Sequence, residues 1–230
     1  MPGEHRENFS AMGNEKVIYP DPNHPDRIRA ELRKKESGYQ PTERQMRGRF
    51  YLSKILHFIF PAAIPEVYAA GTKDGGYLDI EKVETDEDHR RMQAARAKTE
   101  SGKHLSNEES VEMRQLAQKR EQDPKIHDFV NALRKLGVIV DPTGDNYSYG
   151  SDGSFQYLDN SFTPWQINRV GRKLVKAYNA DELAKAIESL APEQKEQAKL
   201  YLERLEQLFK EEEEVLSSQP ETYLTAKNGR

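Results

Sequence analysis

The chain has 230 residues, of which 35% are hydrophobic and 32% charged, and its formal net charge is -4. This length suffices for one compact unit of two small lobes with much exposed surface. The chain contains no cysteine, which excludes disulfides, thiolate metal sites and a cysteine nucleophile and fits a reducing compartment. The negative charge argues against nucleic-acid binding by bulk electrostatics. No apolar stretch approaches the roughly 18 to 20 residues of a membrane span, and the N-terminal residues are too polar for a signal peptide, so we expect a cytoplasmic protein that does not contact membranes.

The N-terminal third of the chain reads as short strands around one long helix. Residues 1–8 are polar and predict a disordered terminus. Lys16 to Tyr19 and Arg27 to Leu32 predict a hairpin, because β-prone residues flank a turn rich in proline and aspartate. Residues 41–60 predict a helix that Thr42 begins and Pro61 stops. Two further strands are expected at 66–70 and 76–83, and we assign 9–84 to one β-rich region.

The remaining chain is predicted to be mainly helical. Residues 85–123 are highly charged with few apolar positions, which predicts solvated helices. Pro124 opens an amphipathic helix that Gly137 closes, and 138–140 predicts a buried strand. A hairpin is expected within 138–160, then a helix over 167–178 and further helices up to residue 216. We assign 85–216 to one helical region and 217–230 to a loose tail.

Three polar residues around the predicted hairpin have a spacing that suits phosphate chemistry. Asp141 and Asn146 stand in a D-x-x-x-x-N pattern, and Asp159 follows at the end of the hairpin. Carboxylate and amide oxygens are the ligands that Mg²⁺ prefers, and a carboxylate beside a hydroxyl can orient it and take its proton. The alternative is that residues 141–146 form a plain turn, since turns select Asp, Pro, Gly and Asn. A calcium loop is disfavoured because its ligand pattern is not met.

This pattern and the order of elements resemble the protein-kinase fold, in which nucleotide binds between a β-rich N-lobe and a helical C-lobe. The spacing of Asp141 and Asn146 matches the kinase catalytic loop, and Asp159 lies where the metal-binding Asp of D-F-G would sit. The resemblance implies an α+β, two-lobed fold with a small N-lobe and a reduced helical C-lobe. It also implies Asp141 as the catalytic base and Asn146 and Asp159 as ligands of Mg²⁺, with ATP as the nucleotide.

A second resemblance concerns the nucleotide base. Residues 80–83, Ile-Glu-Lys-Val, are similar to a kinase hinge, which implies that Ile80 is the gatekeeper and that Glu81 and Val83 face adenine. The alternative is that these residues form a plain edge strand without a binding role. Arg33 or Lys34 would substitute for the phosphate-binding lysine, because no V-A-I-K sequence is present.

The chain also departs from the kinase pattern. Ile139 and Val140 replace the His and Arg of the catalytic loop, and Asn160 and Ser161 replace the Phe and Gly of D-F-G. The glycine-rich loop is reduced to Gly13, and the middle of the long helix holds Lys54 rather than a carboxylate for the usual Lys to Glu pair.

Two functions therefore stay open for a kinase-like fold, and a plain structural or interaction protein with no kinase ancestry is a third alternative, which the hairpin arrangement disfavours. The first is an atypical small kinase that binds ATP and Mg²⁺ and transfers phosphate to an unknown acceptor or to itself. The second is a pseudokinase-like scaffold that binds a protein partner through the charged insert 85–123 or the terminal helices. The retained Asp141, Asn146 and Asp159 favour the first, and the missing Lys to Glu pair favours the second.

Overall fold

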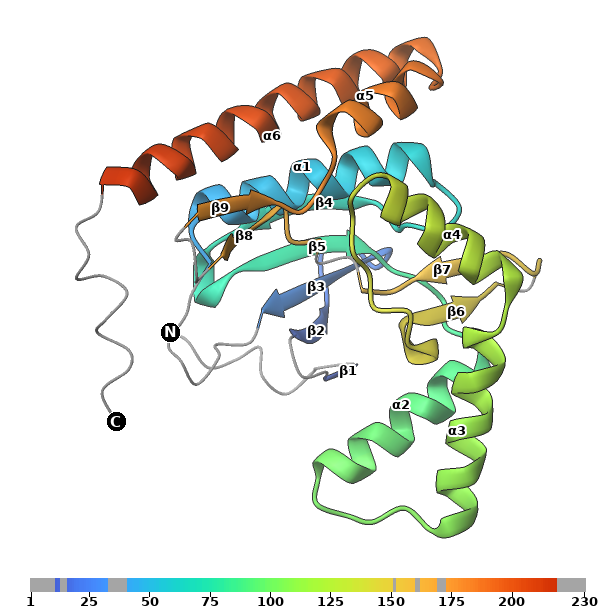
Figure 1. The fold of residues 1–230 in the computed structure, drawn as a ribbon. Helices are drawn as coiled ribbons and strands as arrows, with labels where there is room; N and C mark the ends of the chain where they lie inside the picture. Colours follow the sequence, from blue (N-terminus) through green and yellow to red (C-terminus); the bar gives the residue numbers. More distant parts are fainter. Residues whose placement is uncertain are drawn as a thin grey trace.

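The computed structural model describes residues 11–12, 16–32, 41–150, 152–159, 162–168 and 173–218. Within these ranges the chain is a mixed α+β protein with six α-helices, one five-stranded sheet and two small hairpins (Figure 1). The predicted α+β class is thereby confirmed. No helix in the described ranges combines the length and the apolar composition needed to cross a membrane.

The five-stranded sheet is antiparallel, and all of its strands lie within residues 11–81. Its order is β1-β2-β3-β5-β4, and its strands are β1 (Ala11–Met12), β2 (Lys16–Pro20), β3 (Arg27–Leu32), β4 (Val67–Gly71) and β5 (Tyr77–Glu81). In the observed register Ala30 of β3 lies between Ile18 and Leu78. Because side chains alternate along a strand, this register gathers the apolar residues on one face.

Helix α1 (Glu43–Ile59) connects that sheet to the rest of the protein. Thr42 forms the predicted N-cap, completed by the side chain of Gln45 as a capping box. Met46 of α1 packs with the buried face of the sheet, made of Ala30, Val67, Leu78 and Ile80. Other residues of the same helix, among them Leu52, Ile55 and Leu56, belong to a second and larger core. The two cores are thus joined through one helix.

The larger core is built by the C-terminal helices and one hairpin. Its elements are α4 (Pro124–Lys135), α5 (Ala180–Glu188), α6 (Pro192–Ser218), β6 (Tyr147–Tyr149) and β7 (Phe155–Tyr157). Figure 1 shows α6 lying along α1 on the side away from the sheet. Trp165 is 3% exposed and packs edge-on against Phe209, so it is a core residue.

The charged insert forms a helical arm. Helices α2 (Glu87–Glu100) and α3 (Asn107–Glu121) pack on each other and extend away from the remaining structure (Figure 1). Asp86 and Ser106 are their N-caps. We refer to α2 and α3 together as the α2–α3 arm.

Two secondary-structure predictions are wrong. Residues 138–140 form no strand: Val138 is buried, but Ile139 is 86% exposed. Residues 167–178 are not a helix, because β8 (Trp165–Asn168) and β9 (Lys173–Lys176) pair there as an antiparallel hairpin. Around Leu174, which is buried between exposed Lys173 and Val175, the exposure alternates with the period of a strand.

Candidate functional site

Asp141 lies on the surface between α4 and the β6–β7 hairpin. Its side-chain Oδ1 accepts a hydrogen bond from the backbone amide of Thr143 at 3.0 Å and another from the Thr143 hydroxyl. The carboxylate therefore caps its own turn, as expected for Asp followed by Pro and Thr. Only one of its two oxygens takes part in these bonds.

Asn146 ends the short 3-10 helix η3 (Gly144–Asn146) and contacts both neighbouring segments. Its side-chain Nδ2 donates to the carbonyl of Asp141 at 3.4 Å, and its own carbonyl accepts from the amide of Leu158 at 2.8 Å. The pairing of Tyr147 with Tyr157 continues this contact into the hairpin. As a result, Asn146 lies beside the segment that leads into Asp159.

Asp141 and Asp159 line the same hollow, which has a volume of about 190 Å³. Tyr157 and Gln166 contribute to its wall, together with residues 138–140. From the sheet, the ammonium of Lys16 reaches Asp159 and lies 2.5 Å from its Oδ1. The side chains of Lys16 and Asp159 are 15% and 31% exposed, so the pair is largely shielded from water.

Tyr157, which lines the hollow, and its strand partner Tyr147 are both fully buried. Burial raises the pKa of the Tyr157 hydroxyl far above its usual range, and the charge of Asp159 adds to this rise. Burial likewise raises the pKa of Tyr147, with a further contribution from Asp141. Among the described residues, the Tyr147 hydroxyl has no hydrogen-bond partner. Both phenols are therefore neutral, and among the described residues the charged groups that line the hollow are Asp141 and Asp159, the second of which pairs with Lys16.

The residues expected to hold the nucleotide base lie elsewhere. Ile80 is 4% exposed and belongs to the small core under the sheet. The Glu81 carboxylate accepts the amide of Glu66 at 3.1 Å, and Val83 is half-buried. The residues that line the hollow beside Asp141 do not include these three. Arg33, and with it Gly13 and Lys34, falls outside the described residues.

A Lys to Glu pair does occur on α1, with reversed polarity. The helix supplies the cation, Lys54, whose ammonium lies 2.5 Å from the carboxylate of Glu66 just before β4. Burial raises the pKa of Glu66, but the hydrogen bond and charge of Lys54 outweigh it and the pKa is lowered overall. This pair ties α1 to the sheet, and no local sequence pattern indicated it.

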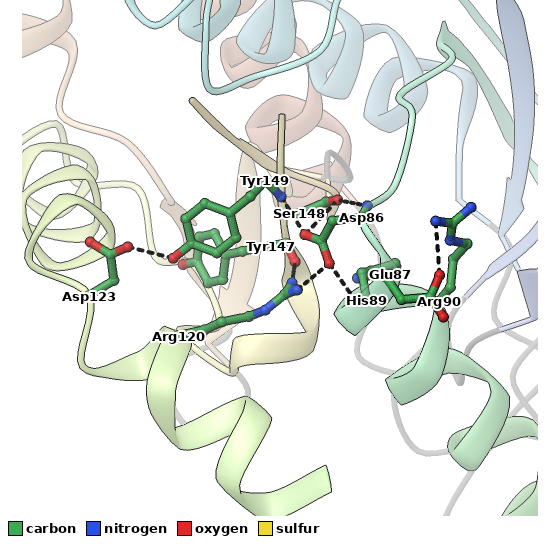
Figure 2. A network of polar contacts seen from close by, with 9 residues as sticks. All are labelled: Asp86, Glu87, His89, Arg90, Arg120, Asp123, Tyr147, Ser148 and Tyr149. Carbon is green, nitrogen blue, oxygen red and sulfur yellow. Dashed lines mark hydrogen bonds and ion pairs between the residues drawn. The ribbon is translucent and has the colours of Figure 1, made fainter. Parts of the chain in front are cut away.

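A polar network joins the α2–α3 arm to the β6–β7 hairpin (Figure 2). Its centre is the Asp86 carboxylate, which accepts from the amides of His89 at 2.7 Å and Tyr149 at 2.6 Å and from the Ser148 hydroxyl at 3.2 Å. The guanidinium of Arg120, which is 3% exposed, donates to Asp86 at 2.5 Å and to the carbonyl of Tyr147.

The same network lines a larger hollow of about 440 Å³ with Tyr149 and Asp123, whose side chains are hydrogen-bonded at 2.6 Å. Burial raises the pKa of Asp86, but the amides and Arg120 outweigh this and the pKa is lowered. Burial lowers the pKa of His89, the charge of Arg120 lowers it further, and Asp86 opposes the shift only in part.

The arm also contacts η3 directly. Arg96 of α2 lies 3.1 Å from Asp145, and Glu121 of α3 accepts the amide of Gly144 at 3.4 Å. The α2–α3 arm therefore supports the turn that carries Asn146. The sequence indicated only a solvated charged surface here, because partners so far apart in the chain leave no local pattern.

These observations define a mixed α+β protein with two carboxylates and an amide gathered beside a hairpin. No family model matches the chain, and no curated protein matches it. Among solved structures the chain is similar to WbdD, described as a bifunctional kinase-methyltransferase. The match to its complex with the kinase inhibitor LY294002 has 15% identity and a TM-score of 0.33, and covers 95% of this chain and 47% of WbdD. Two other WbdD structures match with TM-scores of 0.32 and 0.30 and with 15% and 16% identity, each covering 94% of this chain and 46% and 45% of WbdD.

The chain thus spans less than half the length of the protein it matches. TM-scores of this size do not establish a common fold. A kinase-like function must therefore be argued from the residues of this chain.

Proposed function

We propose that this chain is an atypical kinase-like protein that binds ATP and Mg²⁺ and transfers phosphate to an acceptor or to itself. One observation carries the proposal: Asp141 and Asp159, which lie in separate segments, line one hollow. Asn146 is hydrogen-bonded to Asp141 and to the residue before Asp159. The proposal includes the two-lobed arrangement, with the five-stranded sheet as the smaller lobe.

The donor set fits a hard cation. Carboxylate and amide oxygens suit Mg²⁺, which usually takes one or two carboxylates and completes its coordination with phosphate and water. Within the described ranges, no three His, Asp or Glu side chains gather closely enough to hold a metal alone. We assign Asp159 and Asn146 as the metal ligands. When bound, the metal neutralises charge on the phosphate oxygens.

The role of Asp141 follows from its hydrogen bonds. Thr143 donates to Oδ1 from both its backbone amide and its hydroxyl, which orients the carboxylate and leaves Oδ2 to face an acceptor. A carboxylate in this position orients an acceptor hydroxyl and takes its proton as the hydroxyl oxygen bonds to the γ-phosphorus of ATP and the bond from that phosphorus to ADP breaks. The exposed setting of Asp141 gives an acceptor access from solvent.

The hollow accommodates the phosphate end of a nucleotide rather than the whole molecule. Its volume of about 190 Å³ is below the roughly 300 to 1,000 Å³ of sites for complete small ligands. From the resemblance to kinases we assign the base to Ile80, Glu81 and Val83 and a phosphate contact to Arg33.

Calorimetric titration with MgATP tests the binding site. Asp159→Asn should weaken binding by about tenfold or more, since even outer-shell partners of metal ligands typically contribute 10- to 100-fold. Asp128→Asn is the control, because it removes the same charge from an exposed position on α4. Unchanged affinity in Asp159→Asn would refute the site.

Phosphate transfer is tested separately by following autophosphorylation with mass spectrometry. Asp141→Ala should retain MgATP binding within about threefold and lose about 10²- to 10⁴-fold in rate, the usual contribution of a general base. Equal transfer rates in Asp141→Ala and the wild type would exclude Asp141 as the base.

The second candidate is a pseudokinase-like scaffold. It is favoured by the existing partners of the two carboxylates, because Lys16 pairs with Asp159 and Thr143 donates to Oδ1 of Asp141 without any ligand. The α2–α3 arm extends from the structure and would offer the partner surface (Figure 1). Absence of MgATP binding up to millimolar concentration would favour this function over phosphotransfer.

A further inference from the structure

Lys16 is directed toward the candidate site by the register of the sheet. It begins β2 opposite Leu32 of β3, and it shares a strand face with Ile18, which packs on the small core. At the end of this face its ammonium meets Asp159 at 2.5 Å. The hollow is lined by residues within 138–141, 157–159 and 162–166 and by Ala177. Asp159 therefore contacts Lys16 of the sheet and also lines the hollow, whose other residues come from the C-terminal part of the chain.

The burial of Lys16 means that it needs an anion. Its side chain is 15% exposed, and a largely desolvated ammonium is costly unless a charged or hydrogen-bonding partner replaces its water. Asp159 supplies that partner in the structure described. A divalent cation bound to Asp159 would replace Lys16 as the partner of the carboxylate and would repel the ammonium beside it. Lys16 would then lose its partner unless a second anion arrived with the metal.

We propose that Lys16 is a phosphate-binding cation of this site, in addition to Arg33, and that it competes with the metal for Asp159. This inference rests on the proposed function and deepens it by naming a cation that receives the phosphate. Binding of the metal alone is disfavoured because the metal displaces Lys16 from Asp159. Metal with phosphate is favoured because the phosphate oxygens become the new partner of the ammonium. Lys16 thereby couples metal binding to phosphate binding.

The proposed role of Lys16 and a purely structural role predict opposite changes in the affinity of the site for metal alone when Lys16 is replaced. Replacing a structural pair would weaken the fold and lower the affinity for every ligand of the site. Removing a competing cation should instead raise the affinity of the site for metal alone, while the affinity for a phosphate compound falls. Opposite changes in two affinities cannot come from general destabilisation.

The experiment measures two affinities in the full chain: Mn²⁺ alone by electron paramagnetic resonance, and MgATP by calorimetry. Lys16→Gln should bind Mn²⁺ about threefold or more tightly than the wild type, a size expected for an ion pair whose carboxylate is 31% exposed. It should bind MgATP about 10- to 100-fold more weakly, because a charge-assisted contact to phosphate is lost. Lys135→Gln, an exposed position on α4, is the matched control and should change neither affinity.

Lys16→Arg provides a second variant that keeps the charge and can bind phosphate. It should retain wild-type affinity for Mn²⁺ and MgATP within about threefold. If the wild type binds MgATP but both affinities of Lys16→Gln fall together, or neither changes, the role of Lys16 is refuted and the proposed site stands. If a folded Lys16→Arg loses MgATP binding, the role is refuted as well. If the wild type binds no MgATP, the proposed function fails and this inference fails with it.

Discussion

Arg120 offers the sharpest test of how the α2–α3 arm is held. Its guanidinium is 3% exposed and pairs with Asp86 at 2.5 Å while donating to the carbonyl of Tyr147. Arg120→Met keeps the apolar stem but removes the charge. Breaking a buried ion pair from one side costs about 3 to 5 kcal/mol. Asp86 keeps its bonds from the amides of His89 and Tyr149, so we expect the lower part of that range, about 3 kcal/mol.

The assay is urea unfolding followed by circular dichroism, with the thermal midpoint as a second measure. A loss of about 3 kcal/mol corresponds to a fall of about 6 to 12 °C in Tm for a chain of this size. Arg91→Met is the control, because the Arg91 to Glu112 pair on the same arm is 46% and 40% exposed and should contribute less than about 1 kcal/mol. Equal effects of the two variants would refute the assigned role of Arg120.

The pH dependence of Arg120→Met gives an independent check. The lowered pKa of Asp86 means that its ionised form stabilises the fold. This contribution is complete above the unfolded pKa of about 3.9 and is lost as the pH falls through the lower pKa of the folded state. The difference in stability between wild type and Arg120→Met should therefore narrow below about pH 4. A constant difference down to pH 2 would contradict this reasoning.

Three further changes test other contacts. Gly48→Ala should lower the free energy of unfolding in urea by about 1 to 3 kcal/mol despite the better helix propensity of Ala, because the new Cβ would lie 2.7 Å from the Trp165 ring. In a double-mutant cycle, Trp165→Phe should restore part of that loss. The pKa of His89 is lowered, so its protonation favours unfolding and the stability of the wild type should decline as the pH falls below about 6.5. His89→Gln should flatten that decline, and an unchanged pH profile of stability would exclude His89 as its source. Gly144→Ala should cost about 2 kcal/mol, since its Cβ would meet the carbonyl oxygen of Ala117 at 2.5 Å, and faster hydrogen exchange in α3 should accompany the loss if this contact holds the arm.

Most helices were predictable from the sequence because their signals are local. Thr42 and Gln45 form a capping box within one turn of α1, and Gly137, at a φ of +74°, ends the segment after α4. The hairpin that follows Asn146 was likewise predictable, since β-prone residues flank a turn at Gly150 to Gly153. The wrong helix over 167–178 shows the weakness of short apolar runs, whose spacing fits a helix and whose β-branched residues fit a strand.

The sequence alone determined where the chain turns, where most of the helices form, and that Asp141, Asn146 and Asp159 flank one hairpin, because caps, turns and periodicity act over a few neighbouring residues. Only the tertiary structure decided which distant charges meet. Lys16 and Asp159 are separated by 143 positions, and Arg120 reaches Asp86 across the arm. Such pairs depend on how the sheet, the arm and the hairpin pack together. The local sequence pattern around a long charged side chain is the same whether its charged end lies in water or on a buried partner.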